Sequence, residues 1–274
     1  MERIQSAIAK GRAARQNLPA VTNPQVHLPV TRKEDEAAKA WAALAEMPLD
    51  RMHLETARVV AHEPGLAASP YDMMRTNLMR AMRDHGWTRV GITSPSSSCG
   101  KTTTCVNLAF SLARQSELRV MVLELDMRRP AMMKTLGIGG GKGFAAVLDG
   151  SASAEAGLVK VWPNLAFGLN RGPVANASEL LASTQAGAAI DAIEAKFKPD
   201  IILFDMPPML VIDDTMAFLD QTDCALLIAA SEQSTVAEID KAGKELASHT
   251  SVLGVVLNKC RYMDKGEGYG YGAY

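Results

Sequence analysis

The stretch that decides the fold is Thr93-Ser94-Pro95-Ser96-Ser97-Ser98-Cys99-Gly100-Lys101-Thr102. An apolar run leads into it, and a helical pattern from Thr103 to Arg114 leads out of it. A strand, a loop of small residues and a helix together predict a phosphate-binding loop, because main-chain N–H groups and a helix N-terminus attract anions. In such a loop Lys101 reaches the β- and γ-phosphates, and the Thr102 hydroxyl ligates Mg²⁺. The first glycine of the usual G-x-x-x-x-G-K-[ST] pattern is replaced by Pro95, so this stretch alone leaves an ordinary serine-rich turn as an alternative.

The composition is that of a globular protein with one large α/β domain and an extension. The chain has 274 residues, of which 47% are hydrophobic and 22% charged. A net charge of −1 favours neither nucleic acid nor an anionic membrane as a partner. The four cysteines form no C-x-x-C pair, which is typical of reduced thiols in a cytoplasmic protein. No apolar run approaches the length of a membrane-spanning helix, and no signal peptide is visible.

Three domains are expected along the chain: residues 1–68, 69–260 and 261–274. Residues 1–68 read as a basic, partly disordered arm followed by connector helices, because prolines at 19, 24 and 29 interrupt regular structure. The alternative for the arm is a docking segment for a partner or an anionic membrane face. Residues 34–46 read as one helix, and a second helix is expected from Ser69 to about Asp84.

From residue 89 onward, strands alternate with helices, which predicts a doubly wound, mostly parallel sheet with helices on both faces. The run 119–125 is continuously apolar, as expected for a strand buried on both sides. The expected strands are 90–93, 119–125, 165–169, 201–204, 225–229 and 252–257, and the expected helices are 102–115, 130–136, 144–148, 178–197, 215–219 and 235–247.

Polar side chains follow several of these strands, at the edge of the sheet where such folds bind ligands. Glu124 and Asp126 follow the second strand, Asp205 ends the 201–204 strand, and Asn258 ends the last one. Carboxylates beside a phosphate loop are what Mg²⁺ requires, because the ion takes one or two carboxylates together with phosphate oxygens. A helix cap is the alternative for any single one of these acids, but their convergence with Lys101 favours a magnesium–nucleotide site.

From Ser69 to the C-terminus the chain resembles the bacterial tyrosine autokinases of capsule and exopolysaccharide export, relatives of the deviant P-loop ATPases. The matching stretches are Arg75-Thr76-Asn77-Leu78, the phosphate loop, Leu125-Asp126-Met127-Arg128-Arg129-Pro130, Gly172-Pro173 with Asn176 and Glu179-Leu180-Leu181, Phe204-Asp205-Met206-Pro207-Pro208, and Gly254-Val255-Val256-Leu257-Asn258-Lys259.

This resemblance implies an ATP- and Mg²⁺-dependent enzyme that transfers the γ-phosphoryl group to tyrosines near its C-terminus. It implies catalytic roles for Lys101, Glu124, Asp126 and Asp205, and metal binding by Thr102, Asp126 and Asp205. The residues implied in nucleotide binding are Ser98, Cys99, Gly100, Lys101, Thr102, Thr103 and Asn258. The resemblance further implies an inner-membrane polysaccharide chain-length regulator as activating partner, which would place the protein in the cytoplasm, peripheral to the inner membrane.

The C-terminal residues support this interpretation independently. Four of the five tyrosines, Tyr262, Tyr269, Tyr271 and Tyr274, lie in the last 13 residues, in a Gly/Tyr-rich segment that cannot bury a core. Such a tail can present tyrosines to a neighbouring copy, which predicts self-association through the tail. Phosphorylation adds nearly two negative charges to each tyrosine, so repulsion would loosen the assembly. A tail without function is the alternative.

The chain departs from the family pattern at three places. The usual Asp-x-Asp motif reads Glu124-x-Asp126, whose first carboxylate reaches one methylene further. Ser98 replaces a loop glycine. In the family's Glu-x-x-Arg-x-x-Arg motif, which is linked to ring assembly, Ser69 and Asp72 precede Arg75, so only the last arginine is kept.

Two other functions remain open from the sequence. One is a partner-switched ATPase of the MinD/ParA type that positions cell-division or plasmid machinery, but its signature lysine would fall at Ser96. The other is a non-catalytic ATP-binding scaffold subunit of the export machinery, which Glu124 and Asp72 favour.

Overall fold

The computed structural model describes residues 33–139 and 142–260. The chain divides into two units between Glu34 and Asp35, and the second unit carries the elements described below, apart from the first two residues of α2. The strands are β1 (Ala45–Glu46), β2 (Arg89–Thr93), β3 (Val120–Glu124), β4 (Leu158–Trp162), β5 (Leu165–Gly168), β6 (Ile201–Asp205), β7 (Cys224–Ala230) and β8 (Ser251–Asn258). The helices are α2 (Lys33–Ala42), α3 (Arg51–Thr56), α4 (Ser69–His85), α5 (Lys101–Ala113), α6 (Met132–Leu136), α7 (Ala145–Leu148), α8 (Ala154–Gly157), α9 (Ala177–Leu181), α10 (Thr184–Phe197) and α11 (Val236–Ala247), with a 3₁₀ helix, η1, at Leu219–Gln221.

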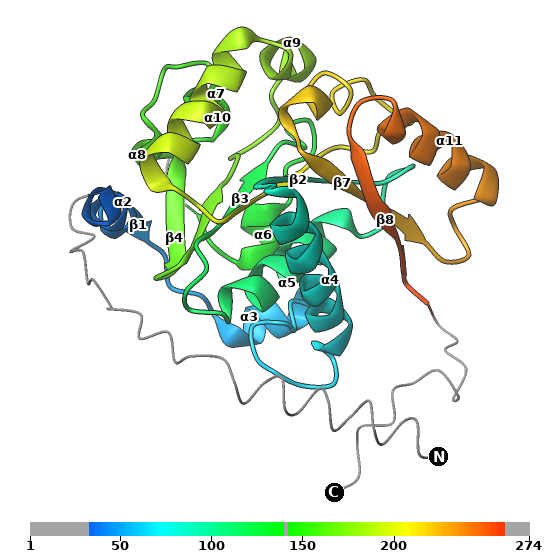
Figure 1. Cartoon of the computed structure of the whole chain (residues 1–274), viewed down its shortest axis with the longest axis horizontal. Helices are drawn as coiled ribbons and strands as arrows, with labels where there is room; N and C mark the ends of the chain where they lie inside the picture. The colour runs from blue at the N-terminus through cyan, green and yellow to red at the C-terminus, as the bar shows by residue number, and fades with distance from the viewer. Residues whose placement is uncertain (1–32, 140–141, 261–274) are drawn as a thin grey trace, which may run out of the picture. The chain divides into compact units, whose positions relative to one another are not determined.

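The strands of the described residues form a single sheet in the order β1-β4-β5-β3-β6-β2-β7-β8 (Figure 1). Every neighbouring pair is parallel except β4 and β5, which are antiparallel. The strand that leads into the phosphate loop, β2, lies between β6 and β7. The predicted doubly wound, mostly parallel sheet is thereby confirmed, and the carboxyl ends of β2, β3 and β6 meet at one edge.

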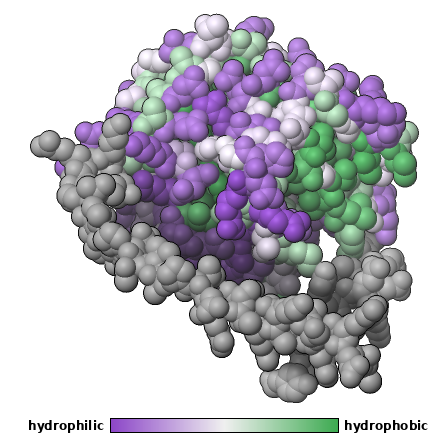
Figure 2. Space-filling model, in the orientation of Figure 1, coloured by the Kyte–Doolittle hydropathy of each residue, from purple (hydrophilic) through white to green (hydrophobic). Residues whose placement is uncertain are grey.

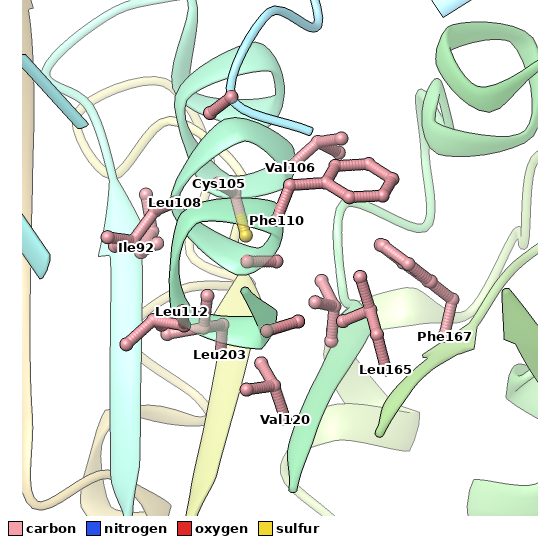
Figure 3. Packing of buried hydrophobic residues seen from close by; sticks show 14 of the residues in the cluster. Ile92, Cys105, Val106, Leu108, Phe110, Leu112, Val120, Leu165, Phe167 and Leu203 are labelled. Atoms are coloured by element: carbon pink, nitrogen blue, oxygen red, sulfur yellow. The ribbon is translucent and has the colours of Figure 1, made fainter. Parts of the chain in front are cut away.

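Alternate side chains of the central strands enter two hydrophobic cores, one on each face of the sheet. The first core packs the strands against α3, α4, α5 and α6, and the second packs them against α2, α7, α9, α10 and α11. Figure 3 shows how α5 contributes to the first core: Leu108 lies beside Ile92 of β2, and Phe110 points toward Phe167 of β5. Burial on both faces explains why the central strands are continuously apolar.

The segment expected as a connector, residues 35–68, packs into the second unit. Trp41 and Leu44 are buried in the core on one face, and Leu54 and Val59 in the core on the other. Trp41 Nε1 donates a hydrogen bond to Phe197 O at 2.7 Å. The helix expected over 34–46 ends at Ala42, because the chain then forms β1, which pairs with β4. The expected boundary at residue 69 therefore does not separate compact units, and residues 1–32 lie outside the described part of the chain.

Two further expectations about elements were wrong, and strand β4 was missed. The single helix expected over 178–197 is two helices, because the Ser183 side chain caps a new helix by accepting from Ala186 N at 3.1 Å. The helix expected over 215–219 is a set of turns that ends in η1. The antiparallel strand β4 was not expected at all, since its five residues mix Lys160 among apolar neighbours.

Helices α4 and α5 lie side by side in front of the sheet (Figure 1). Strand β8 forms the edge of the sheet next to them, and Val255 and Leu257 on it are exposed. Figure 2 shows apolar surface over this side of the molecule. A groove of about 690 Å³ runs between α4 and β8.

Candidate nucleotide-binding and phosphoryl-transfer site

The phosphate loop turns into α5 through two residues in the left-handed backbone region. Gly100 has φ +90° and precedes the first residue of α5, and Ser98 has φ +64°. The end of β8 holds this turn in place: Asn258 Nδ2 donates to Cys99 O at 2.9 Å, and Lys259 Nζ donates to Ser98 O at 2.6 Å. The carboxyl ends of β2 and β8 therefore meet at the phosphate loop.

The two residues after the turn contact acids from two other strands. Lys101 Nζ lies 2.6 Å from Asp126 Oδ2, just beyond β3. Thr102 Oγ1 donates to Asp205 Oδ2, at the end of β6, at 2.7 Å. Parallel strands bring these groups together because their carboxyl ends share one edge of the sheet. The convergence of Lys101, Thr102, Asp126 and Asp205 expected from the sequence is observed.

The electrostatics of this cluster favour a bound cation. Burial alone would lower the pKa of Lys101, but the charges of Asp205 and Asp126 outweigh it and raise the pKa. Burial raises the pKa of Asp205 to about 6, against the opposing effects of Lys101 and Thr102. Among the described residues, Asp205 Oδ1 is a buried polar atom with no hydrogen-bond partner. A buried carboxylate oxygen left without a partner, beside a threonine hydroxyl, fits a Mg²⁺ ion that completes its shell with phosphate oxygens and water.

A cavity of about 300 Å³ opens beside this cluster. It is lined by Ser97, Ser98, Lys101, Thr102, Asp126, Arg128, Arg129, Ala131, Pro208, Val211 and Ile212. Three cationic side chains at a helix N-terminus make the cavity suitable for phosphate groups.

Glu124 does not belong to the lining of this cavity. Its side chain is fully buried and accepts main-chain N–H groups on both oxygens: Ala131 N and Met132 N at 2.7 Å, and Asn170 N at 2.8 Å. Burial raises the pKa of Glu124 to about 7, although these hydrogen bonds oppose the shift. The carboxylate thus ties the end of β3 to the start of α6 and to Asn170, which lies just beyond the neighbouring strand β5. The extra methylene of glutamate gives it the reach to do so.

An ion pair beside the cavity was not identified from the sequence. Arg128 donates through Nε and Nη2 to both oxygens of Asp214, at 2.8 and 3.0 Å, and the Asp214 side chain is completely buried. Ser178 Oγ, at the start of α9, also donates to Asp214. The only indication in the sequence was the pair of acids Asp213-Asp214, which follows a buried strand. Two adjacent acids are equally typical of a surface turn, so only the contact with Arg128 identifies the ion pair.

The remaining predicted residues are distributed around the loop. Cys99 is buried, and its Sγ lies 3.6 Å from Ser234 Oγ. Burial raises the pKa of this thiol, but hydrogen bonds from Ser96 and Ser234 outweigh it and lower the pKa. Thr103 lies in the first turn of α5, where its carbonyl accepts from Asn107 Nδ2 at 2.8 Å. The four predicted phosphoacceptors, Tyr262, Tyr269, Tyr271 and Tyr274, lie outside the described residues.

The fold and the site define a P-loop nucleotide-binding domain. Residues 90–268 match the model of the CobQ/CobB/MinD/ParA nucleotide binding domain family, and the chain belongs to it. Within it, the chain belongs to the bacterial tyrosine-protein kinases: it is 30% identical to the tyrosine-protein kinase YwqD of Bacillus subtilis over 208 residues, which are 75% of this chain and 86% of the relative.

Longer relatives match over only part of their length. The putative tyrosine-protein kinase EpsB of Ralstonia solanacearum is 32% identical over 222 residues, which are 80% of this chain but only 29% of EpsB. The kinase domain of Escherichia coli tyrosine kinase ETK superposes with a TM-score of 0.63 at 22% identity, covering 76% of this chain and 80% of that one. The structural match shows the shared fold. None of the helices within residues 33–139 and 142–260 has the length and apolarity that a bilayer crossing requires.

Proposed function

We propose that this chain is an ATP- and Mg²⁺-dependent protein-tyrosine kinase that phosphorylates its own C-terminal cluster, Tyr262, Tyr269, Tyr271 and Tyr274. The observation that carries the proposal is the convergence of Lys101 and Thr102 with Asp126 and Asp205 beside one cavity. Membership of the tyrosine-kinase family and the tyrosine-rich tail support it. Phosphoryl transfer needs mainly positioning and charge neutralisation, which this cluster supplies.

The side chains have distinct tasks in this reaction. Main-chain N–H groups from Ser98 to Thr103, together with Lys101, hold the phosphates, and Asn258 contacts the base. Thr102, Asp126 and Asp205 would hold Mg²⁺, which would neutralise charge on the phosphates. The tyrosine oxygen forms a bond to the γ-phosphorus as the bond to the bridging oxygen breaks, and ADP leaves. The Lys101 side chain turns from Asp126 Oδ2 to the phosphates, which frees this oxygen. The oxygen then accepts the proton of the tyrosine hydroxyl.

Glu124 acts as a positioning residue in this proposal. Its three main-chain contacts leave it no free oxygen with which to meet the tyrosine or the metal. It holds the segment between Asp126 and Ala131 in the conformation that aims Asp126 into the cavity. The role that the family pattern implies for the first acid therefore falls to Asp126.

Membership of the family also supports a cellular role for this kinase. The proposed kinase controls polymerisation and export of a capsule or exopolysaccharide, in the cytoplasm and peripheral to the inner membrane. Its activator is an inner-membrane polysaccharide chain-length regulator whose cytoplasmic end completes the site. Copies of the chain associate through unphosphorylated tails.

The proposal is tested by incubating the purified chain with Mg-ATP and mapping phosphotyrosine by mass spectrometry. Lys101→Met should abolish the signal, because a phosphate-binding cation is lost. Lys244→Met is the matched control: that lysine is exposed on α11, where it pairs with Asp240, and its loss should leave the signal unchanged. Wild-type protein without phosphotyrosine, even with the activator's cytoplasmic segment present, would contradict the proposal.

The second candidate is a nucleotide-binding subunit that assembles export machinery without tyrosine phosphorylation. The engagement of Glu124 in structural contacts favours it. Partner-stimulated ATP hydrolysis that leaves every tyrosine unmodified would identify this alternative, or a positioning ATPase.

A further inference from the structure

A fully buried acid holds one arginine of the cavity in a fixed orientation. Asp214 accepts from Arg128 Nε at 2.8 Å and from Arg128 Nη2 at 3.0 Å, so the two side chains form a bidentate pair. The Asp214 side chain is completely buried, whereas 40% of the Arg128 side chain is exposed. Arg128 also lines the cavity, together with Lys101 and Thr102. The acid is therefore out of reach of a ligand in the cavity, while the arginine is within reach.

Further hydrogen bonds keep Asp214 in place behind the arginine. Ser178 Oγ, in the first turn of α9, donates to Asp214. The next residue, Thr215, donates through Oγ1 to Pro207 O at 2.6 Å. Burial alone would raise the pKa of Asp214, but the hydrogen bonds from Arg128 and Ser178 outweigh it and lower the pKa. Asp214 is therefore charged at neutral pH, as the binding of a guanidinium requires.

The main chain on both sides of Arg128 is fixed as well. Met127 O accepts from Val174 N at 2.9 Å, and Arg129 N donates to Asp126 Oδ1 at 3.3 Å. The Arg128 guanidinium is thus held through its main chain and through two of its nitrogens. A group held in this way needs little reorganisation when a ligand binds, which favours binding and catalysis.

The pair leaves part of the guanidinium for a ligand. An arginine side chain carries five N–H groups, and Asp214 engages the nitrogens Nε and Nη2, so Nη1 is not used by the acid. The neighbouring Arg129 is held less firmly, because its Nη1 lies 3.5 Å from Ser97 Oγ, at the limit of a hydrogen bond. Of the two arginines, Arg128 is the one that is prepared to bind an anion at a fixed position.

The phosphate loop determines which phosphate Arg128 can meet. The main-chain N–H groups of such a loop cradle the inner phosphates, and its lysine serves the β- and γ-phosphates. Lys101 Nζ lies 2.6 Å from Asp126 Oδ2, and Arg128 follows Asp126 by two residues and lines the same cavity. Arg128 therefore lies toward the outer end of a nucleoside triphosphate.

We propose that Arg128 binds the γ-phosphate of ATP and that Asp214 is the positioning residue that orients it. The proposal rests on the proposed kinase function and deepens it, because it assigns a further group to the same phosphoryl transfer. The charge on the γ-phosphoryl oxygens meets a guanidinium that is already oriented, which favours transfer. ADP lacks this phosphate, so the pair also makes the site prefer ATP to ADP.

Binding without phosphoryl transfer tests the pair first. The full chain is titrated, with Mg²⁺ present, with a non-hydrolysable ATP analogue and with ADP. Asp214→Asn should weaken the analogue about tenfold, because a charge-assisted hydrogen bond is misdirected, and leave the ADP affinity within twofold of wild type. Asp213→Asn, at an exposed neighbouring acid that also accepts from Ser178 Oγ, is the matched control. Equal ratios of the two affinities in Asp214→Asn and Asp213→Asn overturn the proposal.

Arg128→Lys is a second variant, because loss of the buried charge can prevent folding. Lysine keeps a positive charge beside Asp214 but lacks the fork that engages an acid and a phosphate together. Arg128→Lys should therefore keep the ADP affinity, which reports folding, and weaken the analogue about tenfold. If Asp214→Asn does not bind ADP, Arg128→Lys decides, and a wild-type ratio of affinities in that variant overturns the proposal.

The rate of phosphotyrosine formation then separates the pair from the kinase function. At saturating ATP, Asp214→Asn should be slower than wild type by about a hundredfold, and Asp213→Asn should equal wild type. If wild type forms phosphotyrosine and Asp214→Asn keeps both the rate and the ratio of affinities, the pair has no role and the kinase function stands. If wild type forms no phosphotyrosine but the ratio depends on Asp214, the kinase function fails and the γ-phosphate contact stands.

Discussion

Gly100 is the residue on which the shape of the phosphate loop depends. Its φ of +90° favours glycine, and a Cβ added there would overlap Nδ2 of Asn258. Gly100→Ala should therefore displace the Asn258 side chain and break its hydrogen bond to Cys99 O. We expect a loss of about 2 kcal/mol in the free energy of unfolding and a nucleotide affinity lower by about tenfold, measured by urea denaturation and by titration with an ATP analogue.

Gly86 offers the matched control for this prediction. It ends α4 with φ +70°, and a Cβ there would have no neighbour within 4 Å. Gly86→Ala should cost about 1 kcal/mol of backbone strain and leave nucleotide affinity unchanged. Equal nucleotide affinities in the two variants would show that the Gly100 turn is not specific to the site.

Glu124 makes the stability of the nucleotide-free protein depend on pH. Burial raises its pKa from 4.5 to about 7 in the folded state, so the folded protein binds more protons than the unfolded chain between these values. The free energy of unfolding should therefore fall as pH rises from about 4.5 to about 7, by on the order of 3 kcal/mol from this residue. Glu124→Gln removes the titration, so its stability should fall less over the same range.

The measurement for Glu124 is urea denaturation of wild type and Glu124→Gln between pH 5 and pH 8, without nucleotide or Mg²⁺. Asp205, whose pKa is about 6, contributes in the same direction to both proteins, so the difference between the two curves isolates Glu124. Parallel curves would refute the raised pKa of this residue.

At the scale of elements, one acid joins α4 to α5. Asp72 Oδ1 accepts from Ser111 Oγ at 2.6 Å and pairs with Arg75 and Arg114. Burial alone would raise the pKa of Asp72, but these hydrogen bonds and charges outweigh it and lower the pKa. The departure from the family's arginine at this position therefore has a structural reason: an acid here satisfies a serine and an arginine on the next helix.

Removing this acid should loosen the helix pair. Asp72→Asn leaves two partly buried arginines without their counter-charge, so we expect a loss of about 2 kcal/mol in the free energy of unfolding. Asp84→Asn, at an exposed acid near the end of the same helix, should change it by less than about 0.5 kcal/mol. Chemical denaturation at pH 7 compares the free energies of unfolding of the two variants. Equal losses in both would contradict a role of Asp72 in joining α4 to α5.

Strands were predictable from the sequence where helices cover both faces of the sheet. Strands such as β3 and β7 lie between helices on both faces, so their sequences are uniformly apolar and bounded by polar residues. The antiparallel β4 lies near the edge, and its identity depends on pairing with β5. The break between α9 and α10 depends on Ser183, whose capping role is set by backbone geometry rather than by periodicity.

At the scale of the whole molecule, the site joins strands from distant parts of the chain. Lys101 and Thr102 contact acids after β3 and β6, and the end of β8 holds the loop. A ligand in the cavity binds only the folded arrangement, so Mg-ATP at 100 times its Kd should raise the free energy of unfolding by about 2.7 kcal/mol. The melting temperature should then rise by roughly 5–10 °C.

Calorimetry or thermal fluorescence tests this coupling with a non-hydrolysable analogue. Lys101→Met should lose most of the increase in melting temperature, and Lys244→Met should keep it. An unchanged melting temperature of the wild-type protein at saturating analogue and Mg²⁺ would show that the cluster does not bind nucleotide.

The sequence by itself determined the class of fold, the phosphate loop and the acids beside it. These features are local: a glycine turn before a helix, apolar runs buried on both faces, and polar residues at strand ends. Asp126 and Asp205 could be assigned to one site because parallel strands end at a common edge.

Only the tertiary structure decided what each acid near the phosphate loop contacts. Glu124 and Asp126 are two residues apart, yet one is fully buried on three main-chain N–H groups and the other faces Lys101 and the cavity. The Arg128–Asp214 pair likewise joins segments far apart in the chain. Such contacts depend on packing between elements, which no local pattern of residues encodes.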